Sequence, residues 1–421
     1  MKTRVVITGL GVVSPNGIGI EKFSKAIQKG ASGIKFFKEL EDLNFSCCIG
    51  GIPDVTEELK SAYFTPLQLR DFKSSGIMYG CMAGIDAWKD AGLHINLDQP
   101  DYHSGIIFGA GTSGVEKFRE AIYKVDDKQV RRLGSTTVAQ TMASGVSAYL
   151  GGMLGMGNMV TTNSSACTTG TEAIILGYDR IVAGHANRML VGSCADHGPY
   201  VWGGFDALRV LAHKHNDDPE KASRPMSESA SGFVPGSGAA ALVMETLESA
   251  LERKATIYAE VLGGALNSGG QRNGGSMTAP NPEAVQRCIQ MAMLNSGIDS
   301  NDIDCINGHL TATAKDSLEI ENWSNALGRG GKDFPYINSL KSQIGHCLAA
   351  SGSIESVAAV LELYHSFVFP SINCEDVHPE ILELIDSDRI PKKLISKPLN
   401  IIAKASFGFG DVNACVILKK Y

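Results

Sequence analysis

The stretch that decides the fold is Met159-Val160-Thr161-Thr162-Asn163-Ser164-Ser165-Ala166-Cys167-Thr168-Thr169-Gly170, followed by the apolar segment 171–183. Its first four residues predict a short strand, because β-branched residues bounded by a polar turn are typical of strands. The following segment is apolar nearly all round, and a helix of that kind is normally buried. The stretch therefore predicts a strand, a turn and a buried helix, with Cys167 at the helix N-terminus.

The rest of the chain repeats this alternation of short Val/Ile-rich strands with helical segments, which favours a layered α/β fold. The strand at 4–8 with its Gly-rich turn, and the strand at 257–262, open two halves that are alike in outline, so we expect a duplicated fold divided into 1–253 and 254–421. A helix at 247–254 closes the first half. The other expected strands are 105–108, 159–162, 189–192, 240–245, 305–307, 337–339, 401–405 and 414–418.

Composition excludes several classes of protein. The net charge of −7 gives no general affinity for nucleic acid or an anionic membrane. No apolar run reaches the roughly 18 residues of a membrane span. Gly9, Gly11 and Pro15 interrupt the first apolar run, so we interpret it as a strand and turn and not as a signal peptide. The ten cysteines include no CxxC pair, which favours reduced thiols and a cytoplasmic protein.

Two other motifs favour ordinary structural interpretations. The segment 109–114 matches the dinucleotide fingerprint GxGxxG. However, no apolar strand with a terminal acidic residue follows it, so a turn packed against another backbone is the better interpretation. His213 and His215 form an H-x-H pair in a polar loop without further ligands at suitable spacing, and we predict no metal site.

Cys167 has the setting of a nucleophile. A helix N-terminus lowers the pKa of a thiol through its dipole and free N–H groups, and small neighbours leave room for a substrate. The alternative is a core cysteine packed as a small hydrophobic residue, which is the usual state of a buried cysteine. Position alone leaves the two interpretations balanced.

Two histidines and a lysine follow strands of the second half. His309 comes directly after the strand 305–307, Lys341 lies at the end of the strand 337–339, and His346 follows one turn later. Neutral imidazoles donate N–H groups to a carbonyl oxygen that gains charge in a transition state. Two neutral imidazoles near a reactive cysteine would stabilise the oxygen of an enolate.

In this order the motifs resemble the β-ketoacyl-ACP synthases of the elongating type II class, over nearly the whole chain. The resemblance lies in the opening 4–11, the nucleophile stretch, Ser223-Arg224-Pro225 with Gly232-Phe233-Val234, the Lys341-to-His346 segment and Ser406-Phe407-Gly408-Phe409-Gly410.

The resemblance implies a thiolase-like five-layered αβαβα sandwich, a homodimer, and an acyltransferase that needs no cofactor or metal. It implies that Cys167 is acylated, that His309 and His346 promote decarboxylation of a malonyl extender, and that Lys341 orients the site. It further implies an oxyanion hole made by the N–H groups of Cys167 and Phe407, with Phe407 as a gate. Supporting roles fall to Glu355 and Asn413, and Thr112 falls in the acyl pocket.

The partner that the resemblance implies is an acidic acyl carrier protein, which delivers substrates on its phosphopantetheine. Arg209, Arg131 and Arg132 resemble positions that face it. For Arg70 and Lys73 we favour an ordinary solvated surface charge.

Three departures from the family pattern weaken the match to housekeeping fatty-acid elongation. Leu310 replaces a usual Gly, Ser237 stands at a usually acidic position, and Asp411 replaces a usual Gly. They leave open a specialised polyketide or aryl-polyene pathway. The alternative is a chain-length-determining subunit that pairs with an active partner, although such subunits usually lack the cysteine. A thiolase is disfavoured, because Cys415 lies inside an apolar run and is a poor second catalytic cysteine.

Overall fold

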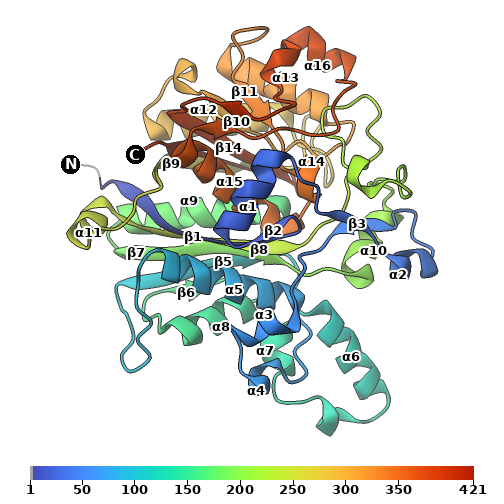
Figure 1. Ribbon diagram of the computed structural model, residues 1–421, viewed down its shortest axis with the longest axis vertical. Helices are drawn as coiled ribbons and strands as arrows, with labels where there is room; N and C mark the ends of the chain where they lie inside the picture. Colours follow the sequence, from blue (N-terminus) through green and yellow to red (C-terminus); the bar gives the residue numbers. More distant parts are fainter. Residues whose placement is uncertain (1–2) are drawn as a thin grey trace.

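A computed structural model describes residues 3–421, and its centre is an eleven-stranded sheet (Figure 1). The strand order is β11-β10-β14-β15-β9-β1-β8-β7-β5-β6, with β2 (Gly17–Ile18) paired to β1. The first half supplies β1 (Val5–Ser14), β5 (Ser104–Ala110), β6 (Val160–Thr161), β7 (Arg188–Ala195) and β8 (Gly238–Thr246). The second half supplies β9 (Ala259–Ser268), β10 (Cys305–Asn307), β11 (Tyr336–Asn338), β14 (Ile401–Gly408) and β15 (Val412–Lys419).

The two halves have the same strand order and the same strand directions. β5 runs parallel to β6 and β7, and β8 is antiparallel to β7 and β1; in the second half β10 runs parallel to β11 and β14, and β15 is antiparallel to β14 and β9. The two sets of five strands meet where β1 pairs with β9. The expected internal duplication is thus visible as topology.

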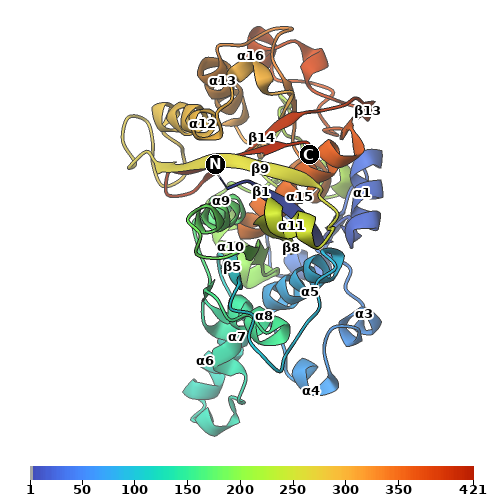
Figure 2. The same cartoon turned by 90° about the vertical axis from the view of Figure 1, so that its left-hand side faces the viewer.

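Helices form three layers around and between the two sets of strands (Figures 1 and 2). α5 (Ser75–Asp90) and α8 (Gly145–Leu154) cover the outer face of the first set, and α12 (Pro282–Ser296) and α13 (Asp316–Leu327) cover the outer face of the second. α9 (Thr169–Val182) and α15 (Ser351–His365) lie between them and contact strands of both sets. Because both faces of these two helices are covered, most of their residues are buried.

Shorter elements complete the fold. The helices are α1 (Ile20–Lys29), α2 (Lys38–Asp42), α3 (Glu57–Ser61), α4 (Pro66–Leu69), α6 (Val115–Asp126), α7 (Thr137–Thr141), α10 (Pro199–Ala207), α11 (Leu247–Glu252), α14 (Lys341–Ile344) and α16 (Pro379–Leu384). The 3₁₀ turns are η1 (Val130–Arg132), η2 (Ala166–Thr168), η3 (Pro219–Lys221), η4 (Ser300–Asp302), η5 (Leu348–Ala350) and η6 (Ser387–Arg389). Two small antiparallel pairs are β3 (Ile34–Phe36) with β4 (Ile49–Gly51), and β12 (Phe367–Val368) with β13 (Ile395–Ser396). Within 3–421 no helix is long and apolar enough to cross a bilayer.

All ten strands expected from the sequence are present, and the main correction concerns the first. We expected the chain to turn after residue 8, but β1 continues to Ser14. Gly9 and Gly11 are required by packing and not by a turn: a Cβ on either would lie 2.2 or 1.9 Å from a carbonyl oxygen of α5. The glycines let helix α5 lie directly on the strand.

The central helices α9 and α15 approach each other most closely at two glycines. A Cβ atom on Gly170 would lie 2.3 Å from the backbone nitrogen of Ser353, and one on Gly352 would lie 2.5 Å from that of Thr171. Close backbone approach of this kind needs residues without a side chain. The contact fixes the N-terminal ends of the two helices side by side.

We expect Gly352→Ala to destabilise the protein, because the new methyl group meets backbone atoms that cannot move aside. The cost should be about 1–3 kcal/mol in the free energy of unfolding, measured by urea denaturation. Gly152→Ala on α8 is the matched control, since its Cβ has nothing within 4 Å, and it should be neutral or stabilise by up to about 1 kcal/mol. Equal effects of the two substitutions would contradict the role given to the glycine contact.

Candidate functional site

Cys167 lies in the 3₁₀ turn η2, immediately before α9, as the sequence predicted. Ala166 before it has a φ of 50°, a left-handed conformation that is strained for a residue with a side chain. The turn is held by Glu172, whose Oε2 accepts hydrogen bonds from Asn163 Nδ2 at 2.7 Å and Ser165 Oγ at 2.6 Å. Sequence analysis missed Glu172, because an acidic residue in the first turn of a helix is an ordinary feature.

His346 is held in one tautomer. It follows α14, and its Nδ1 accepts a hydrogen bond from the backbone N–H of Leu348 at 3.0 Å. The Ser351 hydroxyl is also 3.0 Å from the same nitrogen. Because Nδ1 accepts, the proton of the neutral ring resides on Nε2. His346 therefore presents an N–H donor on its other side.

His309 follows β10, and its backbone is fixed by a buried carboxylate. The N–H groups of His309 and Leu310 each donate to one oxygen of Glu319 at 2.7 Å. Burial, reinforced by Asp316, raises the pKa of Glu319 to about 7. The ring nitrogen Nδ1 is buried without a hydrogen-bond partner in the described structure, so no hydrogen bond there selects the tautomer of His309.

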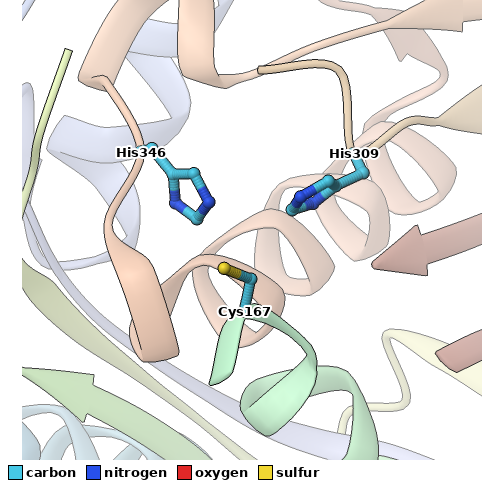
Figure 3. Close-up of side chains that lie close together, drawn as sticks. All are labelled: Cys167, His309 and His346. Carbon is cyan, nitrogen blue, oxygen red and sulfur yellow. The ribbon is translucent and has the colours of Figure 1, made fainter. Parts of the chain in front are cut away.

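The three side chains converge from different elements, as Figure 3 shows. One ligand-type atom from each of Cys167, His309 and His346 lies within 4.8 Å of the other two. The imidazole centroids are 5.4 Å apart in an edge-on arrangement. Burial, with the positive charge of Lys341, holds the pKa of both histidines well below the ordinary value. Both rings are therefore neutral at physiological pH.

The thiol departs from the sequence-based expectation. A helix N-terminus was expected to lower its pKa, but burial raises the pKa of Cys167 to about 11. The Lys341 charge and the N–H groups of Phe409 and Cys167 act in the opposite direction without reversing the shift. The residue as a whole is half-buried, but its sulfur is buried, and a thiolate there loses its solvation. Cys167 therefore rests as a thiol, whereas the expected nucleophile was a thiolate.

Behind this cluster lies a buried ion group. Lys341 contacts Glu355 Oε1, and a second lysine, Lys404, lies 2.8 Å from Glu355 Oε2. All three side chains are buried. Lys341 and Glu355 were expected here, whereas Lys404 was not singled out, because a lone lysine in a strand is usually an exposed one.

The oxyanion hole needs a correction. We expected the N–H of Phe407 to face the reacting centre, but the backbone N–H groups beside the Cys167 sulfur are those of Cys167 and Phe409. Phe407 is a buried residue within β14, opposite Asn413, and its ring lies edge-on to His309 at 6.3 Å. Asn413 binds Asn267 Oδ1 at 3.0 Å, so it supports the sheet behind the site.

Cys167 lies in the wall between two cavities. The first, of about 300 Å³, is lined by His309, His346, Phe407 and Phe409. The second, of about 200 Å³, extends past Thr112, Ala195 and Val201 and is mostly apolar. Thr112 thus lines the second cavity, and its assignment to an acyl pocket stays a prediction. A nucleophile reachable from two sides suits a reaction that joins two substrates.

The cluster contains the ligand types that Zn²⁺ prefers, but its surroundings oppose a metal. Two of the three charges next to it, on Lys341 and Lys404, are positive, and they repel a dication. In addition, the Nδ1 of His346 is engaged by the Leu348 N–H.

The predicted carrier-binding arginines, Arg131, Arg132 and Arg209, are all exposed, as are Arg70 and Lys73. Lys73 forms an ion pair with Glu120 at 3.0 Å, so its charge is partly neutralised within the chain. His213 and His215 lie in an exposed loop, in agreement with the structural interpretation.

The GxGxxG segment is a packed turn, as we favoured. A Cβ on Gly109 would lie 2.1 Å from Thr169, and one on Gly114 would lie 2.0 Å from the carbonyl oxygen of Gln140. The glycines therefore serve contacts within the chain.

The three departures from the family pattern have local explanations. Leu310 is a buried member of the second core. Ser237 is buried beside the Gly51 carbonyl. Asp411 is buried in a left-handed turn and accepts the N–H groups of Gln271 and Asn281 at 2.9 and 2.8 Å. It fastens the loop 269–281, which contributes to the mouth of the first cavity.

The raised thiol pKa predicts a steep pH dependence of alkylation. With a pKa of about 11, the thiolate fraction at pH 7 is on the order of 10⁻⁴, so the iodoacetamide rate at Cys167 should rise about tenfold per pH unit from pH 7 to 9. Peptide mass spectrometry measures it, and Cys167→Ala is the control, because the other nine cysteines are buried. A rate that levels off near neutral pH would show a low-pKa thiolate.

Comparison with known proteins agrees with this geometry. Residues 2–250 match the model of the beta-ketoacyl synthase N-terminal domain, and residues 258–375 match that of its C-terminal domain. A relative from Vibrio harveyi, 3-oxoacyl-[acyl-carrier-protein] synthase 2, is 33% identical over 100% of this chain and 99% of its own length. The 3-oxoacyl-[acyl-carrier-protein] synthase 1 of Escherichia coli is 32% identical over 99% of each chain.

Solved structures give the same result. The ishigamide ketosynthase/chain length factor superposes with a TM-score of 0.89 at 26% identity, over the full length of both chains. A type II polyketide ketosynthase, solved with its acyl-carrier protein and bound to a hexaketide, superposes with a TM-score of 0.88 at 27% identity, again over both full lengths. The thiolase-like fold is therefore confirmed. From the two domain matches and the full-length relatives, this chain belongs to the beta-ketoacyl synthase family.

Proposed function

We propose that this protein joins an acyl group, held as a thioester on Cys167, to a malonyl group on an acyl carrier protein, and forms 3-oxoacyl carrier protein and CO₂. The observation that carries the proposal is the convergence of Cys167, His309 and His346 within 4.8 Å, at the wall between two cavities. One cavity suits an acyl chain and the other suits the incoming extender.

In the first step the Cys167 sulfur attacks the thioester carbonyl of the acyl carrier. The negative charge that develops on the carbonyl oxygen is stabilised by the N–H groups of Cys167 and Phe409. Because the thiol is protonated at rest, its proton leaves during the attack. His309, whose Nδ1 has no partner in the described structure, is the imidazole free to accept it. His309 then gives this proton to the departing carrier sulfur, which leaves as a thiol.

In the second step malonyl carrier protein occupies the first cavity. The bond between its α-carbon and carboxylate breaks, CO₂ leaves, and the electron pair forms an enolate. The Nε2–H of His346 and a ring N–H of His309 stabilise the enolate oxygen. The α-carbon then attacks the acyl group on Cys167, and the cysteine sulfur leaves as a thiolate that takes a proton from solvent. Lys341 orients the site from behind.

Carrier binding is assigned to Arg209, with Arg131 and Arg132 as further contacts. All three side chains are exposed, and the relatives are named for acyl carrier protein substrates. An acidic carrier is attracted to such a surface, and the attraction weakens with salt.

Arg209→Glu should raise the KM for acyl carrier protein, because it reverses a charge that attracts the carrier. Arg70→Glu is the control, since Arg70 is exposed and has no assigned role. Equal effects of the two substitutions on this KM would oppose the assignment.

A homodimer is part of the proposal. β6 ends the central sheet. In the segment α6–α7 of the same half, Phe118, Ile122, Val130 and Val138 are large apolar residues exposed by 48–71%. Exposed apolar surface of this extent is typical of an interface. A monomeric mass in light scattering would contradict it.

We also propose the division into 1–253 and 254–421, and a reducing cytoplasmic location that keeps the ten thiols free.

The second candidate is a chain-length-determining subunit, supported by the ketosynthase/chain length factor among the similar structures. The presence of Cys167, His309 and His346 in one cluster favours the active enzyme. Assembly with a paralogous chain, and no turnover without it, would favour the subunit. The product pathway, fatty acid or specialised polyketide or aryl polyene, follows from the acyl group that is accepted.

The proposed function is tested by product analysis with acyl and malonyl carrier proteins. The unmodified protein should form 3-oxoacyl carrier protein, and Cys167→Ala should form none. Cys167→Gln should still release CO₂ from malonyl carrier protein, because its amide mimics the acyl thioester. In that background His346→Ala should lower decarboxylation by about 10²–10³-fold. Malonyl carrier protein that stays intact with Cys167→Gln would contradict the roles of the histidines.

A further inference from the structure

A second buried lysine shares the carboxylate of Glu355. Lys404 lies on β14, three residues before Phe407, and is fully buried. Its Nζ is 2.8 Å from Glu355 Oε2 and 3.1 Å from Ser406 Oγ, and it also contacts the carbonyl oxygen of Ala405. Lys404 donates hydrogen bonds to the Ala405 and Ser406 oxygens, and its contact with Glu355 Oε2 is an ion pair without hydrogen-bond geometry. Burial lowers the pKa of Lys404, and the neighbouring Glu355 carboxylate acts in the opposite direction.

The buried group carries an excess of positive charge. Lys341 and Lys404 are two cations, and Glu355 between them is one anion. A buried excess charge is costly, so a stability role alone does not explain it. The acidic groups on the neighbouring helix α13, Asp316 and Glu319, have their oxygens occupied by backbone N–H groups of the turn after His309. These hydrogen bonds hold that turn, and the Glu319 carboxyl also interacts with the charges of Lys341 and Lys404. Burial raises the pKa of Glu319 to about 7, so this carboxyl offsets the excess positive charge only above that pH.

We propose that Lys404 is a positioning residue for the condensation: by taking one oxygen of Glu355 it leaves a net positive charge behind the two imidazoles, which keeps them neutral and stabilises the enolate. The inference rests on the proposed function. Lys404 does not contact the reacting atoms. It acts through Glu355 and Lys341 and through the electrostatic field of its ammonium group.

The sign of the Lys404 charge gives the direction in which its loss shifts the histidine pKa values. The positive charges of Lys341 and Lys404 both lower the pKa of His309 and of His346. Two other titratable groups face the imidazoles. The Cys167 thiol is absent from a Cys167→Gln background. Glu319 binds the backbone N–H groups of His309 and Leu310, and burial raises its pKa to about 7. Loss of the Lys404 charge raises the histidine pKa values, so the rings become protonated at a higher pH. The acid limb of decarboxylation then moves to higher pH.

The test measures malonyl carrier protein decarboxylation between pH 5 and 8 in the Cys167→Gln protein. Adding Lys404→Met should shift the acid limb upward and lower the rate at pH 6.5 on the order of tenfold. Lys404→Gln, which loses the charge but keeps N–H donors, should shift it equally. Lys419→Met, the same charge change at an exposed end of the neighbouring strand β15, is the control and should have no effect.

A double variant tests the role of the net charge most directly. Lys404→Met leaves Lys341 paired with Glu355 and no excess charge, whereas adding Glu355→Gln restores one net positive charge. The double variant should therefore return the acid limb toward that of the parent. Lys404→Met should also raise the thermal midpoint, because it removes an excess buried charge and its unbranched side chain fills the space.

Each outcome decides the question. An unmoved acid limb in Lys404→Met, or a double variant displaced further from the parent, would overturn the charge-based role. A lowered thermal midpoint with a uniform loss of rate at every pH would assign Lys404 to structure alone. If the Cys167→Gln parent releases no CO₂, the proposed function itself fails, which is distinct from a failure of the inference.

Discussion

The site depends on the contact between the N-terminal ends of α9 and α15. Gly170 and Gly352 let the two backbones approach within a distance that no side chain permits. Each helix is preceded by a 3₁₀ turn whose first residue, Ala166 or Leu348, has a left-handed φ of 50° or 51°. The duplicated halves thus present the same turn twice, with Cys167 in one and Ala349 at the equivalent position of the other. The contact brings the nucleophile of the first half to the histidines of the second.

Burial then dominates the protonation of four groups in the site. It keeps the Cys167 thiol protonated, both imidazoles neutral and the Glu319 carboxyl near a pKa of about 7. A site in this state carries little negative charge of its own before substrate arrives. The positive field behind it and the N–H groups in front of it are therefore available for the anions that the reaction creates. Preorganised donors in a dry site need little rearrangement when charge develops.

The sequence predicted much of this arrangement, because its signals are local. Strand patterning located all ten expected strands, and strand ends located Cys167, His309, Lys341 and His346. The errors arise where distant segments decide the outcome. β1 continues through Gly9 and Gly11 because α5 lies on them, and Phe409 replaces Phe407 because β14 ends at Gly408 and the chain turns toward the sulfur. A motif gives the order of residues but not which amide faces the centre.

The charge states of the site also could not be predicted from local sequence. A helix N-terminus correctly placed the thiol, yet desolvation outweighs the dipole. Lys404 and Glu172 gain their importance from partners on other elements or from a folded turn, so neither stands out in a linear pattern. The local explanations for Leu310, Ser237 and Asp411 are likewise contacts across the fold.

Intact-protein mass spectrometry after incubation with a panel of acyl carrier proteins tests the central claim most directly, because the account makes Cys167 the carrier of a covalent acyl group. It predicts a thioester adduct whose mass matches the donor acyl group, which is absent in Cys167→Ala and is removed by malonyl carrier protein as product forms. The absence of an adduct with every donor, or an adduct that persists in Cys167→Ala, would contradict it.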